Sequence, residues 1–311
     1  MKGKRTIPEL EWKVGERQHE ANWFGGKYFM ETQPWETLMR KGPDIAGMVC
    51  EDMENMLGGA AGKSCLEIGP GDEPVAARLP FGKILFADIS AKMLMQLRRK
   101  KIRIALKSGN AQAMGRYFKL TPSEKRALRR KGGIVVKEVK LSRLAAGRAK
   151  YYRQDVRKLS KRPHFDAAIA GEVLTHVRPA QRVAVIKKLA LISDAIFAID
   201  SPHKRAREIL AEWKMNARRW LRICRLEERA GRKDVGDIRG RAQRLLSANL
   251  TDARRESRRR VDFSQLARQL GKRGWGVHLK SYRIIERYRK VIVSDSRYTV
   301  MGAKRMAITG Q

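Results

Sequence analysis

A chain of 311 residues with 42% apolar residues can form one large domain, or one domain with appendages, around a packed core. Its 69 basic and 32 acidic residues give a formal net charge of +37, and such an excess opposes compaction unless a polyanion neutralises it. Nucleic acid is the commonest polyanion of this kind and an anionic membrane surface is the second. A generally basic proteome is the alternative that needs no partner.

The three cysteines, Cys50, Cys65 and Cys224, are far apart in the chain and indicate neither a disulfide framework nor a zinc cluster. No apolar run approaches the ~20 residues that span a bilayer. Residues 1–20 lack the apolar core of a signal peptide and carry acids that an organellar presequence avoids. These patterns predict a cytoplasmic protein with reduced thiols and no bound metal.

Apolar and aromatic residues become frequent between Trp23 and Leu57, after a polar start. Pro43-Asp44 favours the start of a helix, and Gly58-Gly59 favours its end after Leu57. We therefore expect residues 1–62 to form an N-terminal helical region that packs against the rest of the chain.

The most informative stretch places a glycine turn between two apolar runs. The first run, Cys65–Ile68, breaks at Gly69-Pro70-Gly71, and a helix-forming segment follows at Pro74–Arg78. The second run, Ile84–Ala87, ends at Asp88. This order predicts strand, turn, helix and strand, with a carboxylate where the second strand ends. Glycines in the turn allow a tight backbone and the close approach of a ligand.

The pattern Glu67-x-Gly69-x-Gly71 followed by Asp88 resembles the first two motifs of class I S-adenosylmethionine (SAM)-dependent methyltransferases. The resemblance implies an α/β, Rossmann-like fold with a mostly parallel seven-stranded sheet, a closing antiparallel hairpin and helices on both faces. It also implies SAM as the cofactor, with Asp88 accepting hydrogen bonds from the ribose hydroxyls. The cofactor-binding residues that these two motifs imply are Glu67, Gly69, Pro70, Gly71, Asp88 and Ile89.

A dinucleotide-binding dehydrogenase is the nearest rival interpretation. It needs a third glycine to bring helix and strand together around a pyrophosphate, and this chain has Glu73 or Pro74 in that region. An acid beside the turn repels a pyrophosphate and suits a cationic sulfonium better. The sequence therefore favours the methyltransferase.

A basic segment interrupts the domain after the next helix. Ser90 can cap a helix over Ala91–Lys101, but residues 110–150 then intervene before the third strand. From Arg116 to Lys150 there are 12 basic and two acidic residues, and Thr121-Pro122-Ser123-Glu124 favours the start of a helix. We expect an inserted basic hairpin or helical arm.

Two further motifs follow this insertion. The segment from Tyr151 to Val156 resembles the third motif of the family, which implies that Asp155 accepts from the adenine amino group and that Val156 lies near the ring. The segment from Phe165 to Val177 resembles the fourth motif, which implies a buried strand whose carboxyl end is Gly171. Gly171 is a further candidate for the cofactor site, and Glu172 and His176 are candidates for catalysis.

A second basic segment separates the fifth strand, Ala195–Asp200, from the last helix, Phe263–Arg273. Residues 204–260 include 19 basic and eight acidic residues, so the two basic segments supply 21 of the 37 excess positive charges. This concentration favours a nucleic-acid-binding face over a merely solvated surface. The candidate nucleic-acid-binding residues are Arg126, Arg129, Arg130, Lys131, Arg218, Arg219 and Arg222.

Gly276–Leu279 and Tyr298–Ala303 resemble the antiparallel hairpin that closes the methyltransferase sheet. We therefore expect a methyltransferase domain over residues 63–306, insertions at about 110–150 and 204–260, and a tail at 307–311.

The leading hypothesis for function is SAM-dependent methylation of a structured or ribosomal RNA. Adenine amines are disfavoured because no Asn/Asp-Pro-Pro-Tyr turn follows the fourth strand, and cytosine C5 because no cysteine is suitably placed. Glu172–His176 resembles a segment of quinone-type O-methyltransferases, so a small-molecule or lipid-like acceptor is the first alternative. The departures at Asp72-Glu73-Pro74 leave a second: a weakly active or inactive RNA- or ribosome-binding protein. No feature of the sequence indicates an oligomeric state.

Overall fold

The computed structural model describes residues 45–71, 74–106, 111, 114, 117, 119–130, 135–159, 163–231, 235–288 and 291–306. The expected helix start at Pro43-Asp44, the acid pair Asp72-Glu73, the candidate Lys131 and the tail at 307–311 lie outside these residues. Within the described part, no helix is both long and apolar enough to cross a membrane.

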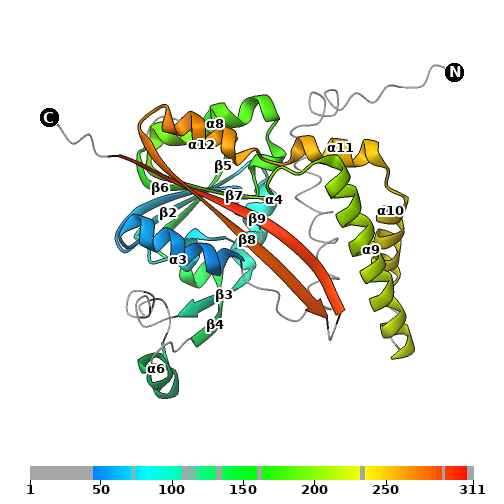
Figure 1. Cartoon of the computed structure of the whole chain (residues 1–311). Helices are drawn as coiled ribbons and strands as arrows, with labels where there is room; N and C mark the ends of the chain where they lie inside the picture. The colour runs from blue at the N-terminus through cyan, green and yellow to red at the C-terminus, as the bar shows by residue number, and fades with distance from the viewer. Residues whose placement is uncertain are drawn as a thin grey trace.

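The described core is a seven-stranded sheet with the strand order β5-β2-β1-β6-β7-β9-β8 (Figure 1). Five neighbouring strands are parallel, and β9 is antiparallel to both β7 and β8. Both faces of the central parallel strands β1, β6 and β7 are covered, and most of their residues are therefore buried rather than alternating. The strands are β1 (Ser64–Ile68), β2 (Lys83–Asp88), β5 (Ala149–Arg153), β6 (Phe165–Gly171), β7 (Ser193–Asp200), β8 (Trp275–Tyr288) and β9 (Val291–Arg305).

Helices pack on both faces of this sheet and form two separate apolar cores. One core joins α3 and α4 to the face that carries Phe86 and Phe197. The other joins α8 and α12 to the opposite face, which carries Leu66 and Ile196, and Figure 1 shows α8 and α12 on the side away from α3. The bounds are α3 (Ile45–Leu57), α4 (Ala91–Arg99), α8 (Pro179–Ile192) and α12 (Phe263–Gly271).

The first insertion starts earlier than the sequence indicated. The expected helix over 91–101 ends at Arg99, and Lys101 already begins a strand of a separate two-stranded antiparallel sheet. The cause is an alternation that buries Ile102, Ile104 and Leu106 on one side. The insertion consists of β3 (Lys101–Leu106), α6 (Pro122–Arg129), β4 (Val135–Lys140) and α7 (Leu141–Leu144).

The expected start of α6 is confirmed. Thr121 Oγ1 accepts a hydrogen bond from the Glu124 amide at 3.3 Å, and the Glu124 carboxylate accepts one from the Thr121 amide at 2.8 Å. This reciprocal capping box satisfies two backbone donors that a helix start otherwise leaves open.

A buried arginine fastens the end of this insertion to the sheet. Arg148 is 6% exposed, and its guanidinium donates to the carbonyls of Leu79 at 2.7 Å, Phe81 at 3.0 Å and Ala77 at 2.9 Å. These carbonyls precede β2, and Arg148 itself precedes β5. The first insertion therefore returns to the sheet at the amino ends of its parallel strands.

We expect Arg148→Ala to lower the free energy of unfolding by about 3 kcal/mol, because it leaves several buried carbonyls without a donor. Arg148→Lys should recover less than half of this loss, since an ammonium cannot reproduce the planar fork. The exposed Arg143 on α7 provides the control, and Arg143→Ala should change stability by under about 0.5 kcal/mol. Urea denaturation measures all three. An Arg148→Ala variant as stable as the control would contradict this account.

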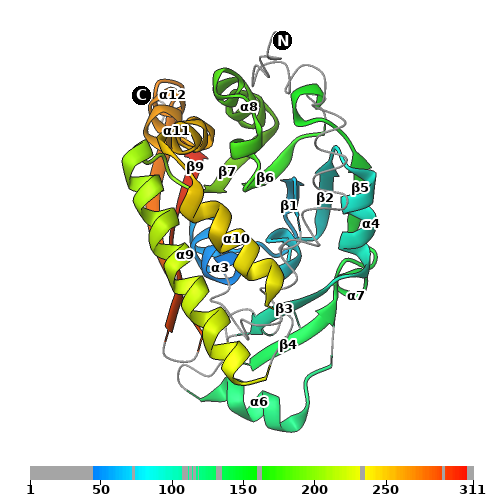
Figure 2. The ribbon, with the colours of Figure 1, turned by 90° about the vertical axis from the view of Figure 1, so that its right-hand side faces the viewer.

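The second insertion leaves and re-enters the sheet at the carboxyl end of β7. Pro202 bridges to Val261 in parallel fashion, the His203 amide donates to the Val261 carbonyl at 2.9 Å, and the Val261 amide donates to the Ser201 carbonyl at 3.3 Å. Between these points α9 and α10 lie side by side and share a small apolar cluster around Cys224 (Figure 2). The helices are α9 (Ala206–Arg229), α10 (Gly236–Ser247) and α11 (Leu250–Arg259).

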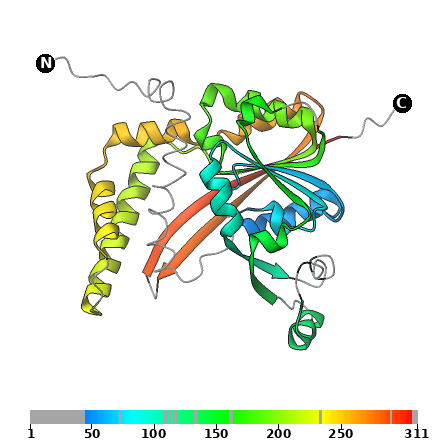
Figure 3. The ribbon, with the colours of Figure 1, turned by 180° about the vertical axis from the view of Figure 1, so that it is seen from behind.

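The two insertions therefore occupy opposite edges of the parallel strands. Figures 1 and 3 show α6 well apart from α9 and α10. The two basic segments do not form one continuous face, and the second insertion is the one beside the carboxyl edge. Sequence counts alone could not separate them, because charge along a chain says nothing about which end of a strand an insertion adjoins.

Candidate cofactor and acceptor site

Four parallel strands end side by side at one edge of the sheet. β1 ends at Ile68, β2 at Asp88, β6 at Gly171 and β7 at Asp200. In open α/β sheets ligands bind outside the carboxyl ends of the strands. The sequence predicted all four strand ends, three of them as parts of the cofactor motifs, and the structure places them at this common edge.

Glu67 lies on β1 and binds the backbone of the segment that follows the glycine turn. It is 1% exposed, and its two carboxylate oxygens accept hydrogen bonds from the amides of Val75 and Ala76, each at 2.8 Å. Burial raises the pKa of Glu67 to about 7, while the two amides favour the ionised form. The segment expected as a helix at 74–78 is a single 3-10 turn, η2 (Ala76–Arg78). Because both Glu67 oxygens bind backbone, this residue positions the turn.

Gly69 and Gly71 both have the left-handed backbone that favours glycine, with φ of +55° and +54°. A Cβ on Gly69 would lie 2.2 Å from Cγ2 of Val173, whereas among the described residues a Cβ on Gly71 would meet only the Gly69 carbonyl oxygen, at 3.9 Å. The first glycine is thus required by its packing against the segment after β6, and the second by backbone conformation alone. Pro70 between them is buried.

Gly69→Ala should therefore cost more stability than Gly71→Ala. We expect about 1–2 kcal/mol for alanine at Gly71, from the left-handed backbone, and about 1–3 kcal/mol more at Gly69, from the overlap with Val173. Thermal or urea unfolding measures the difference. Adding Val173→Ala to Gly69→Ala removes the overlap and should return stability toward that of Gly71→Ala. A double variant that gains nothing would show that the overlap is not the cause.

Asp88 closes β2 at the same edge. Its Oδ1 accepts from the Ser90 amide at 2.8 Å, and its own carbonyl accepts from the Gln154 amide at 2.8 Å. Burial raises the pKa of Asp88 to about 6, although the amides of Ser90 and Ile89 favour the charged form. The Ile89 carbonyl accepts from Arg153 Nε at 3.2 Å. The sheet thus brings the turn after β5 beside the end of β2.

Asp155 lies in that turn and caps the 3-10 turn η3 (Val156–Lys158). Its carboxylate accepts from the Arg157 amide at 2.9 Å and pairs with the Arg157 guanidinium. Burial raises the pKa of Asp155, but the hydrogen bonds and charge of Arg157 outweigh it and hold the pKa below its ordinary value. An adenine amino group would have to compete with Arg157 for these oxygens. Val156 is half-buried against the core on the α8 side.

Glu172 follows β6 with a strained backbone. Among the described residues it is the one non-glycine residue with positive φ, at +52°, and its amide donates to the Ile199 carbonyl at 2.7 Å. Such strain persists where surrounding contacts enforce it and is frequent at functional sites. The side chain is exposed at the carboxyl edge. His176 is half-buried in the 3-10 turn η4 (Leu174–His176).

Asp200, which the sequence motifs did not single out, ends β7 and is 1% exposed. It accepts from the Thr175 amide at 3.0 Å and from the Ser201 amide at 2.7 Å, and Thr175 Oγ1 lies 3.0 Å from both of its oxygens. Burial raises the pKa of Asp200 to about 6, opposed by these bonds and by the charge of Arg182. The available signal was an acid ending an apolar run, the same signal that identified Asp88.

The candidate nucleic-acid-binding residues divide between the two insertions. Arg126, Arg129 and Arg130 are exposed on α6 and at its end, near the amino edge. Arg218 and Arg222 are exposed on α9, in the insertion that adjoins the carboxyl edge, and Arg219 is half-buried there.

The seven-stranded sheet, with its parallel core and its antiparallel β8–β9 pair, matches the sheet that the sequence motifs implied, which is that of the class I methyltransferase fold. Solved structures with a similar fold include magnesium protoporphyrin IX methyltransferase from Synechocystis PCC 6803 with bound SAM. That protein is 14% identical, the match covers 94% of this chain and 98% of that chain, and the TM-score is 0.46.

Two other solved structures are similar at the same level. The methyltransferase domain of bacterial CtHen1-CN is 14% identical, with 83% of this chain and 96% of that chain covered and a TM-score of 0.42. A Rhodobacter sphaeroides chain named for the Zn-dependent alcohol dehydrogenases is 12% identical, with 94% and 99% covered and a TM-score of 0.44. Such likenesses concern the fold and decide neither activity nor substrate. No family profile and no curated protein matches the chain.

Proposed function

We propose that the chain is a SAM-dependent methyltransferase that acts on RNA. The observation that carries the proposal is the pairing of the Gly69-Pro70-Gly71 turn with Asp88 at adjacent strand ends. A carboxylate at the end of the second strand is suited to accept hydrogen bonds from two ribose hydroxyls. At Gly71 the turn leaves the backbone open to a nucleoside, whereas Gly69 packs against Val173, and Glu67 holds the turn in place.

The residues at this edge suit SAM, which when bound supplies an electrophilic methyl group. The chain's own task is to align the acceptor atom in line with that methyl at about 3 Å and to exclude water. Asp155 and Val156 lie on the β5 side, where the adenine would rest. Glu172 and His176 lie after β6, where an acceptor hydroxyl or amine would need a base. We therefore retain both as candidates for proton removal.

RNA is favoured as the acceptor because the second insertion is rooted at the carboxyl end of β7. Its helices α9 and α11 carry exposed arginines next to the edge that holds the proposed cofactor site. A polyanion bound along these helices would lie beside Asp200 and Glu172. Basic residues at the amino ends of the strands would bind RNA away from the proposed cofactor site.

Calorimetry with S-adenosylhomocysteine tests the cofactor site, and transfer of labelled methyl from SAM to total RNA or to a small-molecule extract tests the acceptor. We expect saturable binding of S-adenosylhomocysteine and label in RNA. Binding without label in RNA, but with label in the extract, would replace RNA by a small acceptor. Absence of binding by the intact protein would refute the enzyme and favour a scaffold that only binds RNA.

A further inference from the structure

A small cavity of about 250 Å³ lies at the base of the second insertion. It opens between the first turn of α8, the end of α11 and the first turn of α12. The volume is below the ~300–1,000 Å³ that drug-sized ligands occupy, so it suits a compact group. Its polar lining comes from Arg182, His203, Ser257, Arg258, Arg260, Asp262 and Gln265.

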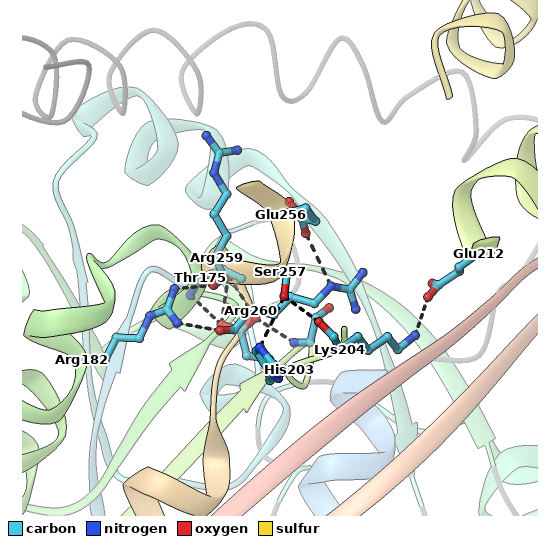
Figure 4. A network of polar contacts seen from close by, with 11 residues as sticks. Thr175, Arg182, His203, Lys204, Glu212, Glu256, Ser257, Arg259 and Arg260 are labelled. Atoms are coloured by element: carbon cyan, nitrogen blue, oxygen red, sulfur yellow. Dashed lines mark hydrogen bonds and ion pairs between the residues drawn. The ribbon is translucent and has the colours of Figure 1, made fainter. Parts of the chain in front are cut away.

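The walls of this cavity are built by Arg182, which is 5% exposed. Its Nε donates to the Val177 carbonyl at 3.0 Å, its Nη1 donates to the Arg260 carbonyl at 2.7 Å, and its Nη2 donates to the Arg259 carbonyl (Figure 4). One guanidinium thus ties the segment before α8 to the end of α11. These three hydrogen bonds hold the α8 side and the α11 side of the cavity together.

Within the described structure, Arg260 has an ion-pair partner for its guanidinium but one unsatisfied hydrogen-bond donor. Its side chain is 10% exposed, and its Nε lies 3.7 Å from the Glu256 carboxylate, within ion-pair range but beyond a hydrogen bond. Within the described part of the chain this buried Nε has no hydrogen-bond acceptor. A buried donor without an acceptor is costly, and an anionic oxygen in the cavity would relieve it.

The lining carries more positive than negative charge. Among the described residues that line the cavity, three arginines face one acid, Asp262, which is a formal charge of +2 without counting His203; Glu256, outside the lining, offsets part of the charge of Arg260. Asp262 Oδ1 accepts from the Gln265 amide at 3.0 Å as the cap of α12, so its charge is partly directed at that helix start. Ser257 Oγ donates to the Lys204 carbonyl at 2.7 Å and lies 3.4 Å from His203 Nε2. The arginine set and the size together select a small anion with several acceptor oxygens.

We propose that this cavity binds a phosphate group, and that in the working protein this phosphate belongs to the RNA substrate. The second half of the proposal rests on the proposed function. The cavity is at the carboxyl edge, because two of its lining residues, His203 and Val261, are joined by the 2.9 Å hydrogen bond that follows the end of β7. A phosphate held here would fix the register of the RNA relative to the acceptor position, while the helices of the insertion supply sequence-independent attraction.

Titration with inorganic phosphate tests the cavity without relying on RNA. We expect saturable binding by the full chain, weakened at least about tenfold by Arg258→Gln, because a charged hydrogen-bonding partner is lost. The matched control is Arg255→Gln, an exposed arginine on the same helix that does not line the cavity, and it should weaken binding by less than about twofold. Thermal unfolding confirms that both variants fold. Equal effects of the two substitutions, or no saturable binding, would overturn the site.

A pair of short RNAs, one with a 5′-phosphate and one with a 5′-hydroxyl, identifies the source of the phosphate. A preference for the 5′-phosphate that Arg258→Gln removes would assign a terminal group. Equal affinities that Arg258→Gln weakens equally would assign an internal phosphodiester. Phosphate binding that neither RNA competes would refute the link to the substrate. S-adenosylhomocysteine binding is measured separately, so an empty cavity beside a filled cofactor site would reject only this inference.

Discussion

Asp88→Ala is expected to weaken S-adenosylhomocysteine binding at least about 100-fold. The carboxylate is proposed to accept hydrogen bonds from two ribose hydroxyls, and hydrogen bonds to a charged group contribute about 1.5–3 kcal/mol each. Losing two removes at least about 3 kcal/mol, which corresponds to a factor of about 100 or more. Asp88→Asn keeps the shape and one acceptor oxygen, so its loss should be smaller, near tenfold.

The matched control is Asp194→Ala. Asp194 is an exposed acid at the opposite end of the sheet, near the start of β7, where it pairs with His164 at 3.0 Å. Calorimetry on the three variants and wild type, with unfolding measured alongside, separates loss of contact from loss of fold. Wild-type affinity in a folded Asp88→Ala protein would show that the ribose is not held at the end of β2, and the cofactor site would have to be abandoned.

The same interaction predicts a pH dependence of binding. Burial raises the pKa of Asp88 to about 6, and only the ionised carboxylate accepts from both hydroxyls. Affinity should therefore rise with pH through about 6 and be up to about tenfold weaker at pH 5 than at pH 7.5. Calorimetry across this range measures it. Asp88→Asn should flatten the curve, and any slope that remains would report Glu67, whose pKa burial raises to about 7.

Stability of the unliganded protein should change in the opposite direction. The pKa of Asp88 is raised from 3.8 to about 6 on folding, so the folded state binds the proton more tightly than the unfolded state. Its contribution to stability is complete below pH 3.8 and is lost as pH rises through about 6. At neutral pH the ionised carboxylate of Asp88 thus strengthens ligand binding but lowers the stability of the unliganded protein. A polar site kept for a ligand commonly has this cost.

The parts of the site that could be predicted from sequence are those set by neighbouring residues. Gly69-Pro70-Gly71 breaks an apolar run, and Asp88 ends another, so both strand ends and the turn between them follow from local pattern. The connection between the two strands, residues 69–82, contains a helical turn and is long enough for the crossover that parallel neighbours need. The edge of the sheet that carries the candidate cofactor residues therefore follows from the amino-acid sequence alone.

The parts that could not be predicted depend on contacts between distant segments. Arg148 lies in a basic insertion and has the sequence context of a surface residue. In the fold it is buried, and its guanidinium donates to carbonyls about 70 residues earlier in the chain. The phosphate cavity needs Arg182 to bond carbonyls at 259 and 260, on the far side of the second insertion. The sequence assigned Gly69 to a tight turn and to the approach of a ligand. The structure adds a packing role, because Val173 leaves no space for a Cβ at this position. No local pattern records any of these pairings.

The second large effect is expected on RNA binding. Arg218→Glu combined with Arg222→Glu reverses two exposed charges one helical turn apart on α9. For an RNA of about 12 nucleotides, long enough for one binding groove, we expect affinity to fall at least about 30-fold at physiological salt. The slope of log affinity against log salt should decrease in magnitude by about 2, because each lost phosphate contact removes close to one released counterion.

Arg126→Glu combined with Arg129→Glu makes the same change in net charge on α6, so it is the control for non-specific attraction. Because α6 adjoins the amino edge and α9 the carboxyl edge, the α6 pair should change short-RNA affinity by less than about threefold and leave the methyl-transfer rate unaltered. Filter binding at several salt concentrations, together with transfer of labelled methyl, distinguishes the two pairs. Equal losses from both would mean that RNA responds to total charge rather than to the placement of α9, and the argument from the strand edges would then fail. A loss confined to the α9 pair would tie the insertion at the end of β7 to delivery of the substrate.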